Sequence, residues 1–158
     1  MNNDSRIWVA YGEMGRFWER SIPASLNGHV RGSKIHGGMP NESLEGTISN
    51  LAKCGEVFWD RKIKEIPSEA AQIVLRGRGA DYISVHADGG REMMEACVKA
   101  ARSIRARIVA VLVLSSIGKK TAQHIYHRKR SAVVRGLLDD AIDCGVTDII
   151  CDGDELPK

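Results

Sequence analysis

An aspartate and a lysine stand two residues apart where an apolar stretch of the chain becomes charged. Residues 57–59 are Val, Phe and Trp, which favour β-strands, and Asp60 and Lys62 follow directly. Side chains two apart on a strand point to the same face, so the carboxylate and the ammonium are expected to lie together. A carboxylate favours the charged form of a neighbouring ammonium, which can stabilise developing negative charge and supply a proton. The alternative is a solvated ion pair, which contributes little.

This pair lies where a predicted strand gives way to a predicted helix. Cys54 and Gly55 are expected to close the preceding helix, so the strand begins near Glu56. Pro67 breaks the strand pattern, and apolar residues then repeat at helical spacing, at Ile66, Ala70, Ile73 and Val74. In α/β proteins the chemistry is done at the end of the sheet where strands lead into helices. The pattern therefore predicts a functional site around the pair.

Strand and helix patterns alternate along the rest of the chain. Strands are predicted at residues 7–11, 30–36, from 56 onward, 81–86, 108–114 and 147–151. Helices are predicted around residues 13–20, 42–53, 66–76, 94–104 and 133–142. The predicted inner faces of three of them are Leu44, Ile48 and Leu51, then Met94, Cys97, Val98, Ala101 and Ile104, and then Val133, Val134, Leu137, Leu138, Ala141 and Ile142. This alternation predicts an α/β fold with a parallel sheet, but it does not distinguish a barrel from a doubly wound sheet. No G-x-G-x-x-G follows the first strand, which disfavours a dinucleotide site.

The composition is that of one globular domain spanning residues 1–158. A net charge of +3 is too small to predict nucleic-acid binding, and no apolar segment approaches membrane-spanning length. The four cysteines show neither C-x-x-C pairing nor zinc-ligand spacing. We therefore predict reduced thiols, a cytoplasmic location, no metal site, and no membrane or nucleic-acid partner.

Four stretches resemble the orotidine 5′-phosphate decarboxylase family, whose third strand carries D-x-K-x-x-D-I-P-x-T. They are SKIHG (33–37), GEVFWDRKIKEIP (55–67), VHADGG (85–90) and VLSS (113–116). They occur in the family's order, and residues 145–151 resemble its sixth strand. The resemblance implies a TIM (β/α) barrel of the ribulose-phosphate-binding type. It also implies a dimeric, cofactor-independent lyase that converts orotidine 5′-phosphate, a nucleotide monophosphate, to UMP and carbon dioxide in de novo pyrimidine synthesis.

The resemblance also assigns roles to single residues. Lys62 matches the lysine that protonates carbon 6 of the pyrimidine, and Asp60 matches the aspartate near the departing carboxylate. Lys34 matches the lysine that pairs with this aspartate and contacts the ribose. Decarboxylation leaves a carbanion, which a fixed ammonium stabilises and then protonates. Glu65 would complete an alternating array of charges.

Other polar residues are candidates for binding the substrate. Ser115 or Ser116 lies near the family position that reads the pyrimidine ring. His36 and His86 end predicted strands on the side of the site. Each histidine either binds substrate or only makes hydrogen bonds within its loop.

The chain departs from the family pattern in several places. The second signature aspartate is Glu65, the threonine is Glu69, and the aspartate that ends strand one aligns with Gly12. Only six βα units are predicted, and six units cannot close an eight-stranded barrel or supply its phosphate-binding loops. We therefore expect an incomplete barrel with exposed first and sixth strands, covered in a homodimer or a higher homo-oligomer.

Three functions remain open at this point. The first is decarboxylation of orotidine 5′-phosphate. The second is a catalytically weak or inactive barrel remnant that serves binding or assembly. The third is the hexulose- or ketogulonate-phosphate branch, which uses magnesium and has a glutamate on strand two, where this chain has Lys34. The basic segment 119–130 could receive a phosphate or an acidic partner, although such runs are more commonly solvated surface.

Overall fold

The structure is a computed structural model that describes residues 6–11, 29–36 and 41–155, without the side chains of residues 41–43. The helix predicted at residues 13–20, the loop at 37–40 and Gly12 lie outside the described residues.

Six parallel strands form one sheet in the sequential order β1-β2-β3-β4-β5-β6. The strands are β1 (Trp8–Tyr11), β2 (Gly32–His36), β3 (Glu56–Ile63), β4 (Tyr82–His86), β5 (Arg107–Val111) and β6 (Asp148–Ile150). The α-helices are α1 (Asn41–Ala52), α2 (Pro67–Arg76), α3 (Arg91–Ser103), α4 (Lys119–Tyr126) and α5 (Arg130–Asp143). Short 3-10 turns, η3 (Ala87–Gly89) and η4 (Gly153–Glu155), follow β4 and β6.

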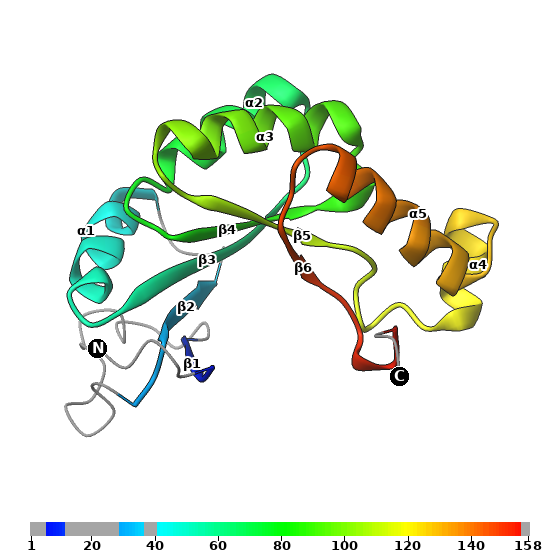
Figure 1. The fold of residues 1–158 in the computed structure, drawn as a ribbon, viewed down its shortest axis with the longest axis horizontal. Coiled ribbons are helices and arrows are strands. Elements are labelled where there is room, and N and C mark those ends of the chain that lie inside the picture. Colours follow the sequence, from blue (N-terminus) through cyan, green and yellow to red (C-terminus); the bar gives the residue numbers. More distant parts are fainter. Residues whose placement is uncertain (1–5, 12–28, 37–40, 156–158) are drawn as a thin grey trace.

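The sheet curls into an open half-barrel with its helices on the outer side (Figure 1). Sequential strand order is the arrangement of a β/α barrel, because a doubly wound sheet reverses its order at a switch point. The barrel alternative is therefore confirmed. Within the described residues, β1 and β6 each pair with one strand only, as the prediction of an incomplete barrel requires.

The core lies between the sheet and the outer helices. Alternate strand residues such as Ile35, Trp59 and Ile83 point outward and are buried beneath the helices. The predicted inner faces of two helices are confirmed, because Leu44, Ile48 and Leu51 of α1 and Met94, Cys97, Val98 and Ala101 of α3 are buried. These contacts hold the strands in place relative to one another, and so determine where the side chains at the strand ends lie.

Aromatic side chains fill the inner face near the amino-terminal ends of the strands. Trp8, Phe58 and Tyr82 meet edge to face, with ring centroids 5.6 to 6.3 Å apart. The guanidinium of Arg31 lies over Trp8 and Tyr82, and that of Arg107 lies over Tyr82. The opposite, carboxyl-terminal end of this face carries Lys34, Asp60 and Lys62.

Two predicted apolar stripes are wrong at one residue each. Ile66 is 63% exposed, because it is the extended N-cap residue of α2 and the helix begins at Pro67. Ile142 is 59% exposed on α5, whose other predicted inner residues are buried or partly buried. This last turn does contact α3, whose Arg91 pairs with Asp140 and Asp143, but Ile142 itself remains exposed.

The basic segment contains a helix that the periodicity did not predict. Helix α4 buries one residue, Ala122, so it has no apolar stripe from which a helix could be read. Strand β5 ends at Val111, earlier than the predicted end at residue 114, although Leu112 and Val113 remain buried. No helix in the described part of the chain is long and apolar enough to cross a membrane.

Candidate active site

A buried carboxylate shared by two lysines occupies the carboxyl-terminal end of the inner face. Asp60 on β3 is 3% exposed, and its Oδ2 accepts hydrogen bonds from Nζ of Lys62 at 2.7 Å and Nζ of Lys34 at 3.3 Å. The register pairs Lys34 with Phe58 and His36 with Asp60 across β2 and β3. Lys34 and Asp60 are therefore diagonal neighbours, close enough for a long side chain to bridge.

Lys62 reaches this carboxylate from an irregular part of β3. The pairing register with β4 shifts between Trp59 and Ile63, and the backbone of Lys62 has a φ of 52°. A left-handed conformation is costly for a residue with a side chain, and such strain clusters at functional sites. The predicted regular strand through Lys62 is therefore wrong in detail, although its ammonium does lie beside Asp60.

Ser84, on β4, completes the site and was not identified from the sequence. Its hydroxyl donates a hydrogen bond to Oδ1 of Asp60 at 2.8 Å and accepts the backbone N–H of Lys62 at 2.8 Å. The signal for Ser84 in the sequence is that it is a polar residue within the apolar run of β4. Its hydrogen-bond partners are 22 and 24 residues away in the chain, so no local pattern connects them to it.

The charges of this site favour ionised Asp60. Burial by itself raises the pKa of Asp60, but hydrogen bonds from Lys62 and Ser84 and the charges of both lysines outweigh burial and lower the pKa below its ordinary value. The carboxylate is therefore charged at neutral pH, and its Oδ2 forms ion pairs with the side chains of Lys34 and Lys62.

His86, Lys64, Asp88 and Tyr126 form a second polar group beside the first. Lys64 Nζ and the Tyr126 hydroxyl donate to Oδ2 of Asp88 at 2.9 and 3.1 Å. Nδ1 of His86 lies 3.8 Å from Oδ1 of Asp88, beyond hydrogen-bond distance. This group joins the ends of β3 and β4 to α4.

Burial lowers the pKa of His86, and the charges of Lys64 and Lys62 lower it further, against the opposing charges of Asp88 and Asp60. The unfolded chain then binds a proton more readily than the folded chain. We expect the free energy of unfolding to decrease as the pH falls below about 6.5, the ordinary histidine pKa.

Urea unfolding of the parent and of His86→Gln at pH 7 and pH 5 measures this effect. The glutamine variant is expected to lose less stability between the two pH values, because it removes the titrating group. Equal losses would show that His86 does not carry this dependence.

Glu65, the fourth predicted catalytic residue, follows β3 and is exposed. It borders a cavity of about 230 Å³ together with Lys62 and His86. The structure thus brings these three predicted residues to one cavity.

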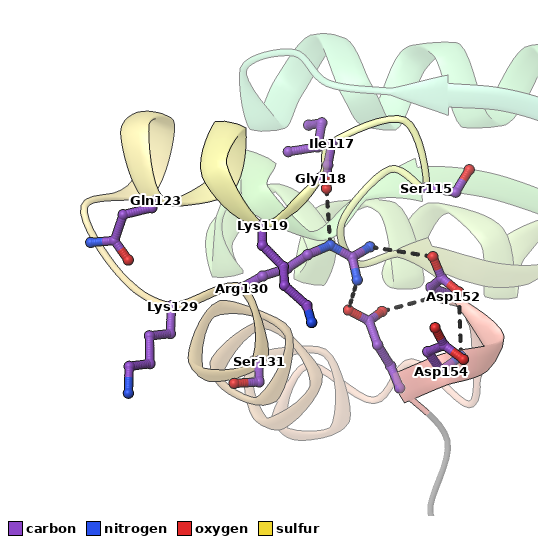
Figure 2. Close-up of a pocket in the computed structure, with 11 residues that line it drawn as sticks. Ser115, Ile117, Gly118, Lys119, Gln123, Lys129, Arg130, Ser131, Asp152 and Asp154 are labelled. Carbon is purple, nitrogen blue, oxygen red and sulfur yellow. Dashed lines mark hydrogen bonds and ion pairs between the residues drawn. The ribbon is translucent and has the colours of Figure 1, made fainter.

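The loop after β5 holds Ser115 and Ser116, both exposed. Ser115 borders a larger cavity of about 520 Å³, built around Arg130 (Figure 2). The Arg130 guanidinium donates to the Ile117 carbonyl at 3.0 Å and pairs with Glu155 and, at 4.0 Å, with Asp152. Basic and acidic side chains line this cavity in equal number, namely Lys119, Lys129, Arg130, Asp152, Asp154 and Glu155.

Within residues 6–11, 29–36 and 41–155, no three His, Cys, Asp or Glu residues are grouped as a metal ion would require.

Residues 28–158 match the family described as "Orotidine 5′-phosphate decarboxylase / HUMPS family". The chain belongs to this family. The predicted resemblance is thereby confirmed, over most of the chain's length.

The orotidine 5′-phosphate decarboxylase of Hahella chejuensis is 35% identical over 107 residues, which are 65% of this chain and 46% of that protein. The corresponding protein of Nitrosomonas eutropha is 30% identical over 155 residues, which are 94% of this chain and 66% of that protein. This member of the family spans about half the length of the first of these relatives and 66% of the second.

Solved structures support the fold of this family member. Orotidine 5′-phosphate decarboxylase from Lactobacillus acidophilus matches with a TM-score of 0.74 and 17% identity, over 94% of this chain and 72% of that one. An uncharacterized conserved protein from Geobacillus kaustophilus matches with a TM-score of 0.73 and 21% identity, over 92% of this chain and 73% of that one. At these identities the likeness shows the fold alone, which in this chain is an incomplete β/α barrel.

Proposed function

We propose that this chain decarboxylates orotidine 5′-phosphate to UMP and carbon dioxide, a step of de novo pyrimidine synthesis. The observation that carries the proposal is the pair of lysine ammonium groups, Lys34 and Lys62, on one oxygen of the buried Asp60 carboxylate. Family membership and the names of the curated relatives supply the substrate.

The proposed reaction needs a fixed positive charge next to a carbanion. Breaking the bond between carbon 6 and the carboxylate releases carbon dioxide and leaves the bonding electrons on the ring. The Lys62 ammonium stabilises this charge and then gives its proton to carbon 6. Asp60 holds the ammonium in place and repels the departing carboxylate, which favours its release. Because these groups are already oriented, little reorganisation accompanies the reaction.

The remaining predicted residues have supporting roles in this proposal. Lys34 would contact the ribose, and Ser115, Ser116 and His86 would contact the nucleotide. Glu65 stands where the resembled family has an aspartate that reaches across the dimer interface. In this proposal Glu65 acts in the site of the second subunit, which is consistent with its exposure.

Two measurements on one sample test the proposal. Calorimetry with UMP measures nucleotide binding, and release of carbon dioxide from orotidine 5′-phosphate measures turnover. We expect both to be positive. Binding without turnover would favour the second candidate, a weak or inactive remnant, for which the open sheet is the supporting observation.

Metal dependence separates the proposed reaction from the phosphosugar branch of the family. The reaction proposed here uses the charges of Lys34, Asp60 and Lys62. We expect full turnover of orotidine 5′-phosphate after treatment with a strong chelator and no increase on adding magnesium. A magnesium requirement would instead favour the hexulose- or ketogulonate-phosphate branch.

We also propose that the chain forms a homodimer or a larger homo-oligomer that covers the open sheet edges. Ile142 and Ile149, in the last helix–strand pair, are 59% and 38% exposed, and β6 has one edge unpaired within the described residues. Exposed apolar residues beside an unpaired strand favour association.

Light scattering at micromolar concentration checks this prediction. We expect an oligomer that Ile142→Glu and Ile149→Glu together shift toward monomer. Ile125→Glu is the matched control, because Ile125 is an exposed isoleucine that lies on α4, outside α5 and β6. A parent chain that remains a stable monomer would contradict the prediction.

A further inference from the structure

Ser84 is a fully buried hydroxyl that contacts both parts of the charged site. It donates to Oδ1 of Asp60 and accepts the backbone N–H of Lys62, each at 2.8 Å. A serine hydroxyl has one proton to donate and lone pairs to accept. The two bonds therefore use it in both ways at once, and an apolar side chain could supply neither.

The bond to Lys62 compensates for an interruption in the sheet. The register between β3 and β4 shifts between Trp59 and Ile63, so regular strand pairing is broken around Lys62. Its N–H bonds instead to the Ser84 side chain, in a residue whose φ is 52°. A strained residue keeps its conformation only where its surroundings hold it. The Ser84 hydroxyl is such a constraint on the backbone that presents the Lys62 ammonium.

Because of the hydrogen bond from Ser84, the two oxygens of the Asp60 carboxylate have different partners. Oδ1 accepts from Ser84, which leaves Oδ2 to accept from both Lys34 and Lys62. Without the hydroxyl, Oδ1 would be buried without this partner, and the carboxylate would lose one of the hydrogen bonds that hold its orientation. The position of Oδ2, the oxygen that both ammonium groups contact, would then be less well fixed.

We propose that Ser84 is a positioning residue, whose hydroxyl sets the Lys62 backbone and the Asp60 carboxylate so that the ammonium is aimed at the reacting carbon. This inference rests on the proposed decarboxylase function. It adds a residue that touches no substrate and acts through the two that do.

Three variants separate positioning from packing. Ser84→Ala removes both bonds, and Ser84→Thr retains the hydroxyl. Ser33→Ala is the matched control, because Ser33 is also fully buried, on β2, and its hydroxyl has no hydrogen-bond partner within the described residues. The same change of side chain is thus made with and without loss of a hydrogen bond.

We expect Ser84→Ala to lower kcat about 100-fold per folded molecule with little change in KM, because misplacing a reacting group by about 1 Å has such an effect. Ser84→Thr should recover much of this loss, and Ser33→Ala should match the parent. A kcat for Ser84→Ala equal to that of Ser33→Ala would overturn the inference.

Amide hydrogen exchange tests the same contact without turnover. In Ser84→Ala, exchange at the Lys62 amide should accelerate on the order of tenfold or more, as expected for a lost hydrogen bond. The Val57 amide, which donates to Asp81 at 2.8 Å, is the internal reference and should be unchanged. The NMR signal of the Lys62 side chain should shift in Ser84→Ala and stay in place in Ser33→Ala.

These readouts keep the two proposals apart. A parent that binds UMP but releases no carbon dioxide would defeat the proposed reaction, while the exchange and the Lys62 signal would still decide the positioning role. Unchanged exchange and an unchanged Lys62 signal in Ser84→Ala would overturn that role in either case.

Discussion

Lys62→Ala is expected to lower turnover of orotidine 5′-phosphate by about three to six powers of ten. Loss of a proton donor and of a fixed positive charge together corresponds to roughly 4 to 8 kcal/mol of transition-state stabilisation. The ammonium concerned lies 2.7 Å from a buried carboxylate, so it is already placed before substrate binds. Initial rates of carbon dioxide release measure the effect, and circular dichroism checks that the variant is folded.

Lys99→Ala is the matched control for this variant. Lys99 is an exposed lysine on α3 that no part of the proposed mechanism uses, so its removal should leave turnover unchanged. Turnover of Lys62→Ala equal to that of Lys99→Ala would remove Lys62 from the mechanism. Lys62→Ala also shortens the side chain, whereas Lys62→Met removes the charge and keeps most of the alkyl stem. Because the mechanism depends on the charge, Lys62→Met should lose as much activity as Lys62→Ala.

Removing both lysine charges is expected to destabilise the fold by about 3 kcal/mol at neutral pH, the lower end for breaking a buried ion pair. The variant Lys34→Met with Lys62→Met leaves Asp60 buried without either cation. The lower end applies because the lysine side chains are 30% and 33% exposed, so water already helps to solvate this site. Urea unfolding at pH 7 measures the loss.

The sign of the pH dependence makes this second prediction specific. Without the lysines, burial should raise the pKa of Asp60 above that of the unfolded chain. When the pKa of Asp60 is raised in the folded state, its protonation stabilises the fold at low pH, and this stabilisation is lost as the pH rises through that pKa. The double variant should therefore recover stability relative to the parent on acidification. Adding Asp60→Asn should also restore stability at pH 7. No recovery in either experiment would show that the loss has another cause.

Much of the fold follows from local patterns in the sequence. The alternation of short apolar strands with amphipathic helices predicted all six described strands, and the inner faces of α1 and α3 are as expected. The pattern missed α4 and misjudged Ile66 and Ile142. A helix that buries one alanine has no stripe to detect, and whether an apolar residue is covered depends on neighbours that lie elsewhere in the chain.

The sequence by itself determined the family and the pairing of Asp60 with Lys62, because both depend on residue types at short, fixed spacing. It did not reveal that Lys62 adopts a left-handed backbone conformation or that Ser84 holds both residues. Only the tertiary structure decided these features, since they arise from a register shift between β3 and β4. Residues more than twenty positions apart meet there through strand pairing, which the periodicity of a single strand cannot specify.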